Sequence, residues 1–164
     1  MSGNAPLNPA ETKSHAAVKP TRPQTYERLG ILYARLALGV AFLSGIADRF
    51  GLYTGRNVGY GNFAGFVAYT AKVNAFMPAS TIPFLAWAVT AAEFSLGVLL
   101  ILGIWPRWVA LASALLLVLF GTAMAISFGI KSPLDYSVFS ASAAAVLLAV
   151  YQPGPNSSRP RAAQ

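Results

Sequence analysis

Long runs of apolar residues, separated by short polar segments, occupy most of the chain. About 20 consecutive apolar residues are needed to cross a bilayer as a helix. We expect four such spans, at about Leu29 to Ala47, Ile82 to Trp105, Trp108 to Phe128 and Leu134 to Tyr151. The pattern predicts an all-α fold: an integral membrane four-helix bundle within residues 26–151.

The connection between the first two spans, residues 48–81, is the only long one. It places Phe63, Phe66, Thr70 and Val73 at helical spacing and adds further aromatic residues suited to the headgroup region. We expect a short amphipathic helix at about Asn62 to Phe76, lying in the membrane interface between spans 1 and 2. The alternative is an aromatic loop packed on the spans.

The two ends of the chain are polar and rich in proline or small residues. Residues 1–25 and 152–164 are predicted to be disordered tails. Lys and Arg are more frequent on the predicted side of the termini than on the other, which favours a cytoplasmic location for both. We therefore expect a protein integral to the bacterial-type cytoplasmic (inner) membrane, with N- and C-termini in the cytoplasm.

The composition excludes several kinds of chemistry. The chain is 55% hydrophobic and 10% charged, with a formal charge of +7 that forms no basic patch, so nucleic-acid binding is disfavoured. Cysteine is absent and the single histidine, His15, lies in the N-terminal tail. Thiolate sites, a histidine-ligated haem in the bilayer and a zinc cluster are therefore not expected, and no metal site is predicted. Any redox carrier would be organic, such as a quinone, or would belong to a partner.

Glu93 is an acid in the middle of the second span. It lies roughly 16 to 21 Å from each interface at 1.5 Å per residue, too far for its side chain to reach the surface. Burying a charge there costs about 3 kcal/mol or more, so Glu93 should face the bundle interior. Arg35, the only basic residue inside a predicted span, is the expected partner in a buried charge pair. The alternative is that Arg35 extends toward cytoplasmic headgroups.

Other polar residues could support this pair. Asp48 and Arg49 end the first span at the outer interface, where solvation is easy, and Arg49 falls near the helix face of Arg35. Asp135 is expected in the opening turn of the fourth helix, where a carboxylate suits the helix dipole. Small residues, Ala37, Ala41 and Gly45 on the first span and Gly97 on the second, favour close packing of these helices.

The segments "YARLALGVAFLSGIADRFG" and "EFSLGVLLILGIWPRWVAL", together with "FVAYTAKVNAFMPAS", resemble the DoxX family of small four-span membrane proteins. The resemblance covers about Tyr26 to Tyr151. It implies an association with membrane oxidoreductase systems, and it matches Arg35 and Glu93 to charged positions of the family. The lysine that often follows the first span in the family is replaced here by Asp48 and Arg49.

Three functions are compatible with these features. The first is an accessory or quinone-associated subunit of a membrane oxidoreductase system, because quinone chemistry needs protons as well as electrons. The second is a small-molecule or proton transporter, for which four spans would have to form a homo-oligomer. The third is a membrane scaffold or assembly factor in which the charge pair only specifies helix pairing.

Overall fold

The computed structural model describes residues 24–56 and 58–151, and helices are the only regular secondary structure in this part of the chain. The helices are α1 (Gln24–Arg49), α2 (Phe63–Val73), the short 3₁₀ helix η2 (Ala79–Thr81), α3 (Ile82–Leu102), α4 (Pro106–Phe128), α5 (Lys131–Asp135) and α6 (Val138–Tyr151). The predicted all-α bundle is confirmed. The predicted tails lie outside the described residues, except that α1 already begins at Gln24.

Within the described residues, three helices are long and apolar enough to cross a membrane: Tyr26–Arg49, Ala79–Leu102 and Pro106–Phe128. The fourth apolar helix, α6, has 14 residues and a length of about 21 Å, shorter than the roughly 30 Å hydrocarbon core. The fourth span was expected from Leu134 without a break. Instead the chain turns at Tyr136 and Ser137, where Ser137 has φ of 55°.

The turn between α3 and α4 comes earlier than predicted. Gly103 has φ of 74°, in the left-handed region that glycine adopts readily, and its N–H bonds to the Leu99 carbonyl. α3 therefore ends at Leu102 rather than Trp105. Pro106 then begins α4, as its fixed φ and missing N–H allow at a first helical position.

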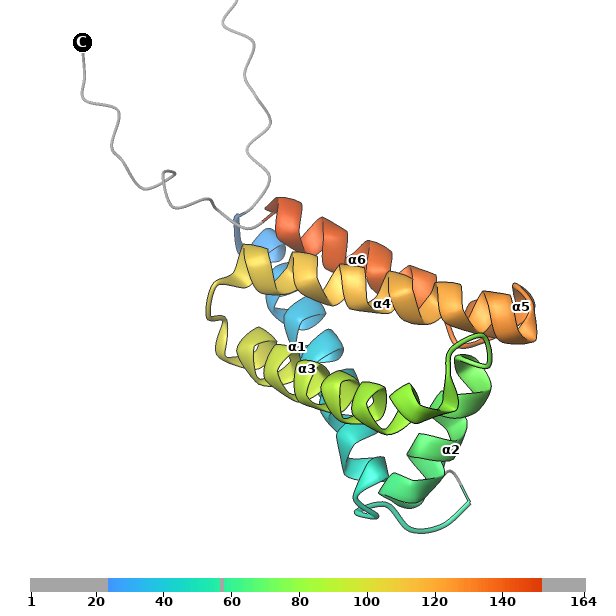
Figure 1. Ribbon diagram of the computed structural model, residues 1–164. Coiled ribbons are helices and arrows are strands. Elements are labelled where there is room, and N and C mark those ends of the chain that lie inside the picture. The colour runs from blue at the N-terminus through green and yellow to red at the C-terminus, as the bar shows by residue number, and fades with distance from the viewer. Residues whose placement is uncertain (1–23, 57, 152–164) are drawn as a thin grey trace, which may run out of the picture.

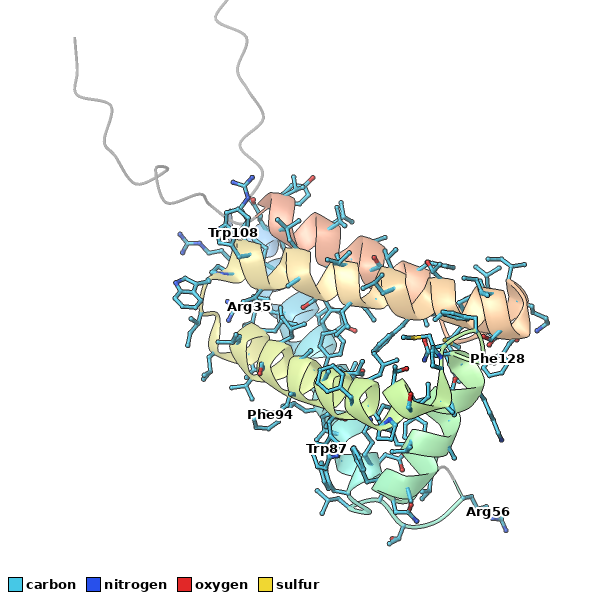
Figure 2. All side chains as sticks on the ribbon, in the orientation of Figure 1. Arg35, Arg56, Trp87, Phe94, Trp108 and Phe128 are labelled. Carbon is cyan, nitrogen blue, oxygen red and sulfur yellow. The ribbon has the colours of Figure 1, made fainter. Side chains whose placement is uncertain are left out.

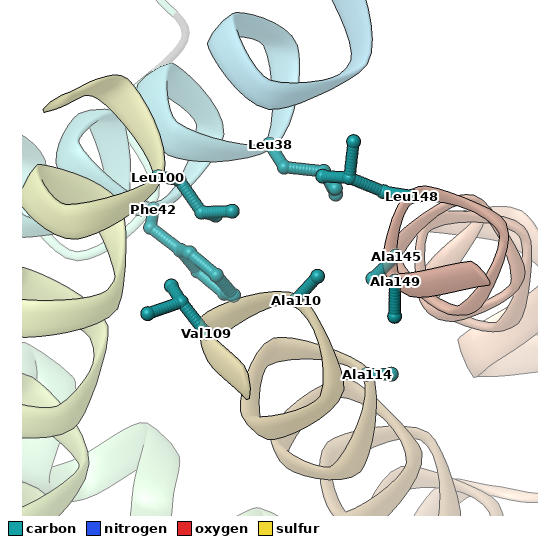
Figure 3. Packing of buried hydrophobic residues seen from close by; sticks show 9 residues of the cluster. All are labelled: Leu38, Phe42, Leu100, Val109, Ala110, Ala114, Ala145, Leu148 and Ala149. Atoms are coloured by element: carbon teal, nitrogen blue, oxygen red, sulfur yellow. The ribbon is translucent and has the colours of Figure 1, made fainter. Parts of the chain in front are cut away.

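The four apolar helices α1, α3, α4 and α6 form two packed pairs, α1 with α3 and α4 with α6. α1 begins and α6 ends at the same end of the molecule, here called the terminal end (Figure 1). The apolar core lies there, between both pairs (Figure 3). It consists of Leu38, Phe42, Leu100, Val109, Ala110, Ala114, Ala145, Leu148 and Ala149.

Glycine brings α1 and α3 into close contact. A Cβ added to Gly39 would lie 2.7 Å from Ile101 Cγ1 and 2.9 Å from the Gly97 carbonyl oxygen, so no larger residue fits without movement. The expected role of Gly97 in close packing is confirmed. Its partner is Gly39, however, and not the predicted series that begins at Ala37, which is exposed.

α2 lies at the opposite end, here called the α2 end (Figure 1). The Asn62 side chain caps α2 by accepting a hydrogen bond of 2.8 Å from the Gly65 N–H. Phe66, Thr70 and Val73 are its buried residues, and the helix contacts α1, α3 and α4. The predicted helix between the first two spans is confirmed in shorter form, and its place at the membrane surface stays a prediction.

The outer faces of the long helices are apolar. Exposed side chains include Trp87 and Phe94 on α3 and Trp108 on α4, and Trp108 and Phe128 lie at opposite ends of α4 (Figure 2). Such a surface fits contact with lipid, and tryptophan at a helix end suits the headgroup region.

Candidate functional site

A cavity of about 570 Å³ lies among α1, α2, α3 and α4 toward the α2 end. One part of its wall is polar and carries Asp48, Arg49, Tyr60, Asn74 and Glu93. The rest is largely apolar and includes Phe42, Leu85, Val89, Leu116, Leu117, Leu119, Phe120 and Met124. The volume falls within the 300–1,000 Å³ typical of small-molecule sites.

Arg49 and Glu93 form a buried ion pair in this polar wall. Arg49 Nη2 lies 2.5 Å from Glu93 Oε2, and the two residues are only 3% and 5% exposed. Gly45, one turn before Arg49, lies next to the pair, since a Cβ there would be in ordinary van der Waals contact with it, 3.9 Å from Arg49 Nη2 and 4.0 Å from Glu93 Oε2. The pair joins the end of α1 to the middle of α3.

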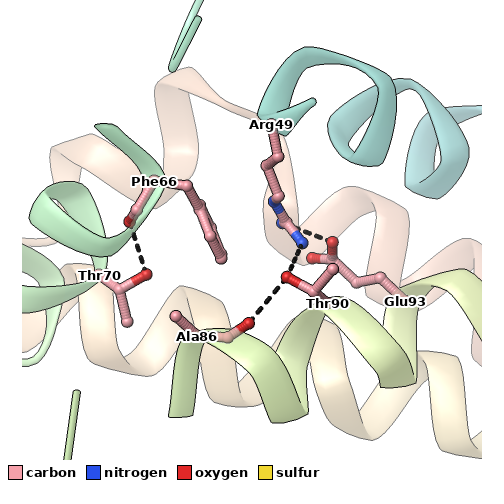
Figure 4. A network of polar contacts seen from close by, with 6 residues as sticks. All are labelled: Arg49, Phe66, Thr70, Ala86, Thr90 and Glu93. Atoms are coloured by element: carbon pink, nitrogen blue, oxygen red, sulfur yellow. Dashed lines mark hydrogen bonds and ion pairs between the residues drawn. The ribbon is translucent and has the colours of Figure 1, made fainter. Parts of the chain in front are cut away.

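Two further residues hold the Arg49 guanidinium group (Figure 4). Arg49 Nη1 donates a hydrogen bond of 3.0 Å to Thr90 Oγ1, and Thr90 Oγ1 donates one of 2.7 Å to the Ala86 carbonyl. The Phe66 ring of α2 lies over the guanidinium carbon at 3.6 Å from the ring centroid. Cation–π contacts of this kind strengthen when water is excluded.

Asp48, the neighbour of Arg49, binds the connection that leads to α2. Its carboxylate accepts hydrogen bonds from the backbone N–H groups of Gly59 at 3.0 Å, Tyr60 at 2.8 Å and Gly61 at 3.4 Å. Asp48 was expected at the solvated end of the first span, but it is 8% exposed. Its charge is compensated by oriented backbone dipoles rather than by water.

Arg35 does not contact Glu93, so the predicted Arg35–Glu93 pair is wrong. Arg35 Nε and Nη2 donate hydrogen bonds of 2.9 and 3.1 Å to the carbonyls of Leu100 and Ile101. These carbonyls belong to the last turn of α3, which a cation stabilises. Arg35 also does not simply extend outward to headgroups, as the alternative held.

The register of α1 against α3 explains why Glu93 pairs with Arg49 and not with Arg35. Gly39 and Gly97 lie at one level, with Arg35 and Glu93 four residues away on opposite sides, so the two charges are about 12 Å apart along the bundle. Helical side chains also tilt toward the N-terminus of their own helix. The tilt takes the Arg35 side chain away from Glu93 and brings the Arg49 and Glu93 side chains toward each other.

Asp135 belongs to a different part of the molecule. It ends α5 instead of opening the fourth helix, and its carboxylate pairs with Lys131 at 2.5 Å on the surface. Both side chains are largely exposed, so the pair contributes little to stability. Asp135 does not line the cavity.

Thr90, Tyr60 and Phe66 belong to the site and were not predicted as site residues. Thr90 lies three residues before Glu93 and therefore on the same face of α3, a spacing that the sequence already displays. Tyr60 and Phe66 come from the connection and α2, whose position against Arg49 depends on tertiary packing.

The polar wall retains unused hydrogen-bonding capacity. Among the described residues, Arg49 Nε and Glu93 Oε2 are buried and have no hydrogen-bond partner, so the 2.5 Å contact is an ion pair rather than a well-directed hydrogen bond. Buried polar atoms without partners are rare and costly. A donor and an acceptor of this kind, beside an apolar chamber, can bind a molecule with a polar head and an apolar body.

The apolar helices and their packing define a helical integral membrane protein. Residues 30–128 match the model of the DoxX family, a stretch of more than half of the chain, and the chain belongs to the DoxX family. No curated protein and no solved structure matches it. The matched residues include α1 from its second turn, α2, α3 and α4, and thus most of the cavity wall.

Proposed function

We propose that the protein is a quinone-associated accessory subunit of a membrane oxidoreductase system. The observation that carries this proposal is the amphipathic cavity of about 570 Å³ with the buried Arg49–Glu93 pair in its polar wall. A quinone has two carbonyl oxygens on a planar ring and an apolar side chain. These features suit buried donors beside aromatic and aliphatic walls.

The chemistry of quinones fits the charges in the wall. Reduction of a quinone to a quinol takes up two electrons and two protons. The Arg49 guanidinium can donate a hydrogen bond to a carbonyl oxygen, and the Glu93 carboxyl group lies close enough to that position to exchange a proton. The electrons are assigned to a partner oxidoreductase, so the role proposed for this chain is to bind and orient.

Binding to a defined quinone tests the proposal. The wild-type protein is purified in nanodiscs, co-purifying quinone is identified by mass spectrometry, and binding of a decyl-substituted benzoquinone is measured by equilibrium dialysis. We expect saturable binding that is lost when both Arg49→Gln and Glu93→Gln are present. The double change removes both charges while keeping both side chains polar.

The exposed pair offers a matched control. Lys131→Gln with Asp135→Asn removes an ion pair of the same separation from the surface, and quinone binding should stay as in the wild type. Absence of saturable binding to the wild type, or equal binding by both double variants, contradicts the proposal.

A scaffold function is the second candidate, and one observation favours it. Arg49 alone connects three helices, through Glu93 and Thr90 on α3, Phe66 on α2 and its own position on α1. A purely structural pair predicts that the Arg49→Gln, Glu93→Gln double variant folds and still supports the host system in complementation. A quinone site predicts a folded protein without that activity.

A further inference from the structure

The connection between α1 and α2 is fixed to the end of α1 by one carboxylate. Asp48 accepts from three consecutive backbone N–H groups, at Gly59, Tyr60 and Gly61. The fit depends on glycine on both sides of Tyr60. A Cβ at Gly59 would lie 2.8 Å from Asp48 Oδ2, and Gly61 has φ of 71°, which favours glycine.

These three hydrogen bonds, here called the Asp48 clasp, fix the backbone of residues 59–61 and thereby place the Tyr60 side chain. The Tyr60 ring lies 5.1 Å from the Phe66 ring in an edge-on arrangement and 5.3 Å from the Tyr69 ring. Its centroid is 5.9 Å from the Arg49 guanidinium carbon. Tyr60 therefore lines the same polar wall as Arg49 and Glu93.

The Tyr60 hydroxyl group keeps its proton under physiological conditions. Burial raises the pKa of Tyr60 to about 12, and Tyr69 nearby adds to the rise. A protonated phenol is a hydrogen-bond donor as well as an acceptor.

We propose that Tyr60 is a binding residue whose hydroxyl group donates a hydrogen bond to a carbonyl oxygen of the bound head group, and that Asp48 is the positioning residue that holds Tyr60 there. This inference rests on the proposed quinone function and assigns recognition of the head group to the connection between α1 and α2. Asp48 acts through the backbone of residues 59–61 and does not itself touch the ligand.

Removing one hydroxyl group tests the role of Tyr60. Tyr60→Phe in the full chain in nanodiscs should weaken binding of the decyl-substituted benzoquinone about three- to tenfold, the effect of one neutral hydrogen bond. The infrared band of one quinone carbonyl should move to higher frequency, because that carbonyl loses a donor. A residue that serves only to pack would not move this band.

Tyr53→Phe is the matched control. Tyr53 lies in the same connection, its hydroxyl group is 3.0 Å from Ser44 Oγ, and it does not line the cavity. Its removal should leave both affinity and carbonyl band unchanged. An equal loss in both variants would mean that the connection acts only through its overall stability, and it would overturn the assignment.

The positioning role of Asp48 is tested through Gly59→Ala, which disturbs the clasp and keeps every side chain of the wall. Gly59→Ala and Asp48→Asn should each reproduce the weaker binding and the carbonyl shift. Neither should weaken binding further when Tyr60→Phe is already present, because both act through Tyr60. Additive losses would show that Asp48 does not work through Tyr60.

The outcomes separate this inference from the proposed function. If the wild type binds the quinone and Tyr60→Phe shows the same affinity and the same carbonyl band, the role of Tyr60 is overturned and the quinone site stays in place. Absence of wild-type binding overturns both. Should Tyr60→Phe fail to fold, the carbonyl band in Gly59→Ala decides, and an unshifted band there overturns the inference.

Discussion

The guanidinium group of Arg49, the last residue of α1, lies 2.5 Å from the Glu93 carboxylate in the middle of α3. The contact crosses the α1–α3 pair on the side of the cavity, and α2 covers it through Phe66. Because both groups are buried, each is stable there only while the other is present. Removing either charge of this pair would therefore disturb the polar end of the cavity.

Breaking the pair on one side should cost stability. Glu93→Gln leaves Arg49 as an unpaired buried charge, and we expect a loss of about 3–5 kcal/mol in the free energy of unfolding. Combining it with Arg49→Gln should recover much of this loss, since coupled residues are not additive. Unfolding measured in mixed micelles checks the cycle. Additive effects would contradict the pairing.

Arg35 should stabilise the bundle independently of Glu93. Arg35→Gln removes two hydrogen bonds to the Leu100 and Ile101 carbonyls, with an expected loss of about 1–3 kcal/mol. The loss should be the same with or without Glu93→Gln, because the two sites share no partner. A coupling energy above about 0.5 kcal/mol in the same unfolding assay would contradict this independence.

Two glycines of α1 should respond in opposite ways to alanine. Gly39→Ala adds a Cβ against Ile101 and the Gly97 backbone and should destabilise by about 1–3 kcal/mol. Gly30→Ala meets nothing within 4 Å and should be neutral or stabilise by up to about 1 kcal/mol through helix propensity. Thermal unfolding of the two variants in nanodiscs compares them directly. Equal effects would exclude the Gly39–Gly97 approach as the contact that sets the register.

Stability at alkaline pH should depend on Tyr60. Its pKa is about 12 in the folded protein and near 10 in an unfolded chain, so between these values the folded state binds more protons. Stability is therefore full below pH 10 and falls as pH rises through 12. Tyr60→Phe should show a shallower fall over this window in chemical unfolding, and Tyr53→Phe should follow the wild type.

The orientation predicted from Lys and Arg can be tested because the native chain has no cysteine. Lys131→Cys at the α2 end should react with an impermeant thiol reagent in intact cells. Arg107→Cys at the terminal end should react only after permeabilisation. The reverse pattern would place the termini outside.

Hydropathy and turn residues were sufficient to predict three of the four main helices and the helix at residues 63–73. The break at Tyr136 and Ser137 was missed because neither glycine nor proline occupies the turning residue. The end of α3 was predicted too late, at Trp105, because Pro106 is the more conspicuous signal in the sequence. The left-handed residue Gly103 ends the helix before it.

The site was predicted in part. The depth of Glu93 correctly indicated a buried acid that needs a cation. The choice of Arg35 failed because matching helix ends cannot determine register to within one turn, whereas the Gly39–Gly97 approach does. The tilt of side chains toward a helix N-terminus would have favoured Arg49 as the partner. Arg49 ends α1, so its side chain tilts back along α1 toward the level of Glu93, whereas the Arg35 side chain tilts away from it. The position of Tyr60 depends on the hydrogen bonds between Asp48 and the backbone of residues 59–61. No periodic pattern of apolar and polar residues in the sequence indicates these bonds.

The separation of Arg49 and Glu93 in the chain has a consequence for biosynthesis. Arg49 leaves the ribosome well before Glu93, so α1 enters the membrane before the partner of its terminal cation has been translated. α3 then brings an acid to mid-membrane depth, at a cost of about 3 kcal/mol if it enters lipid alone. Association of α3 with α1 during its insertion avoids that cost, and the Gly39–Gly97 approach aligns the two helices for it. The order of the helices along the chain thus makes α1 a template that is already in place when α3 is translated.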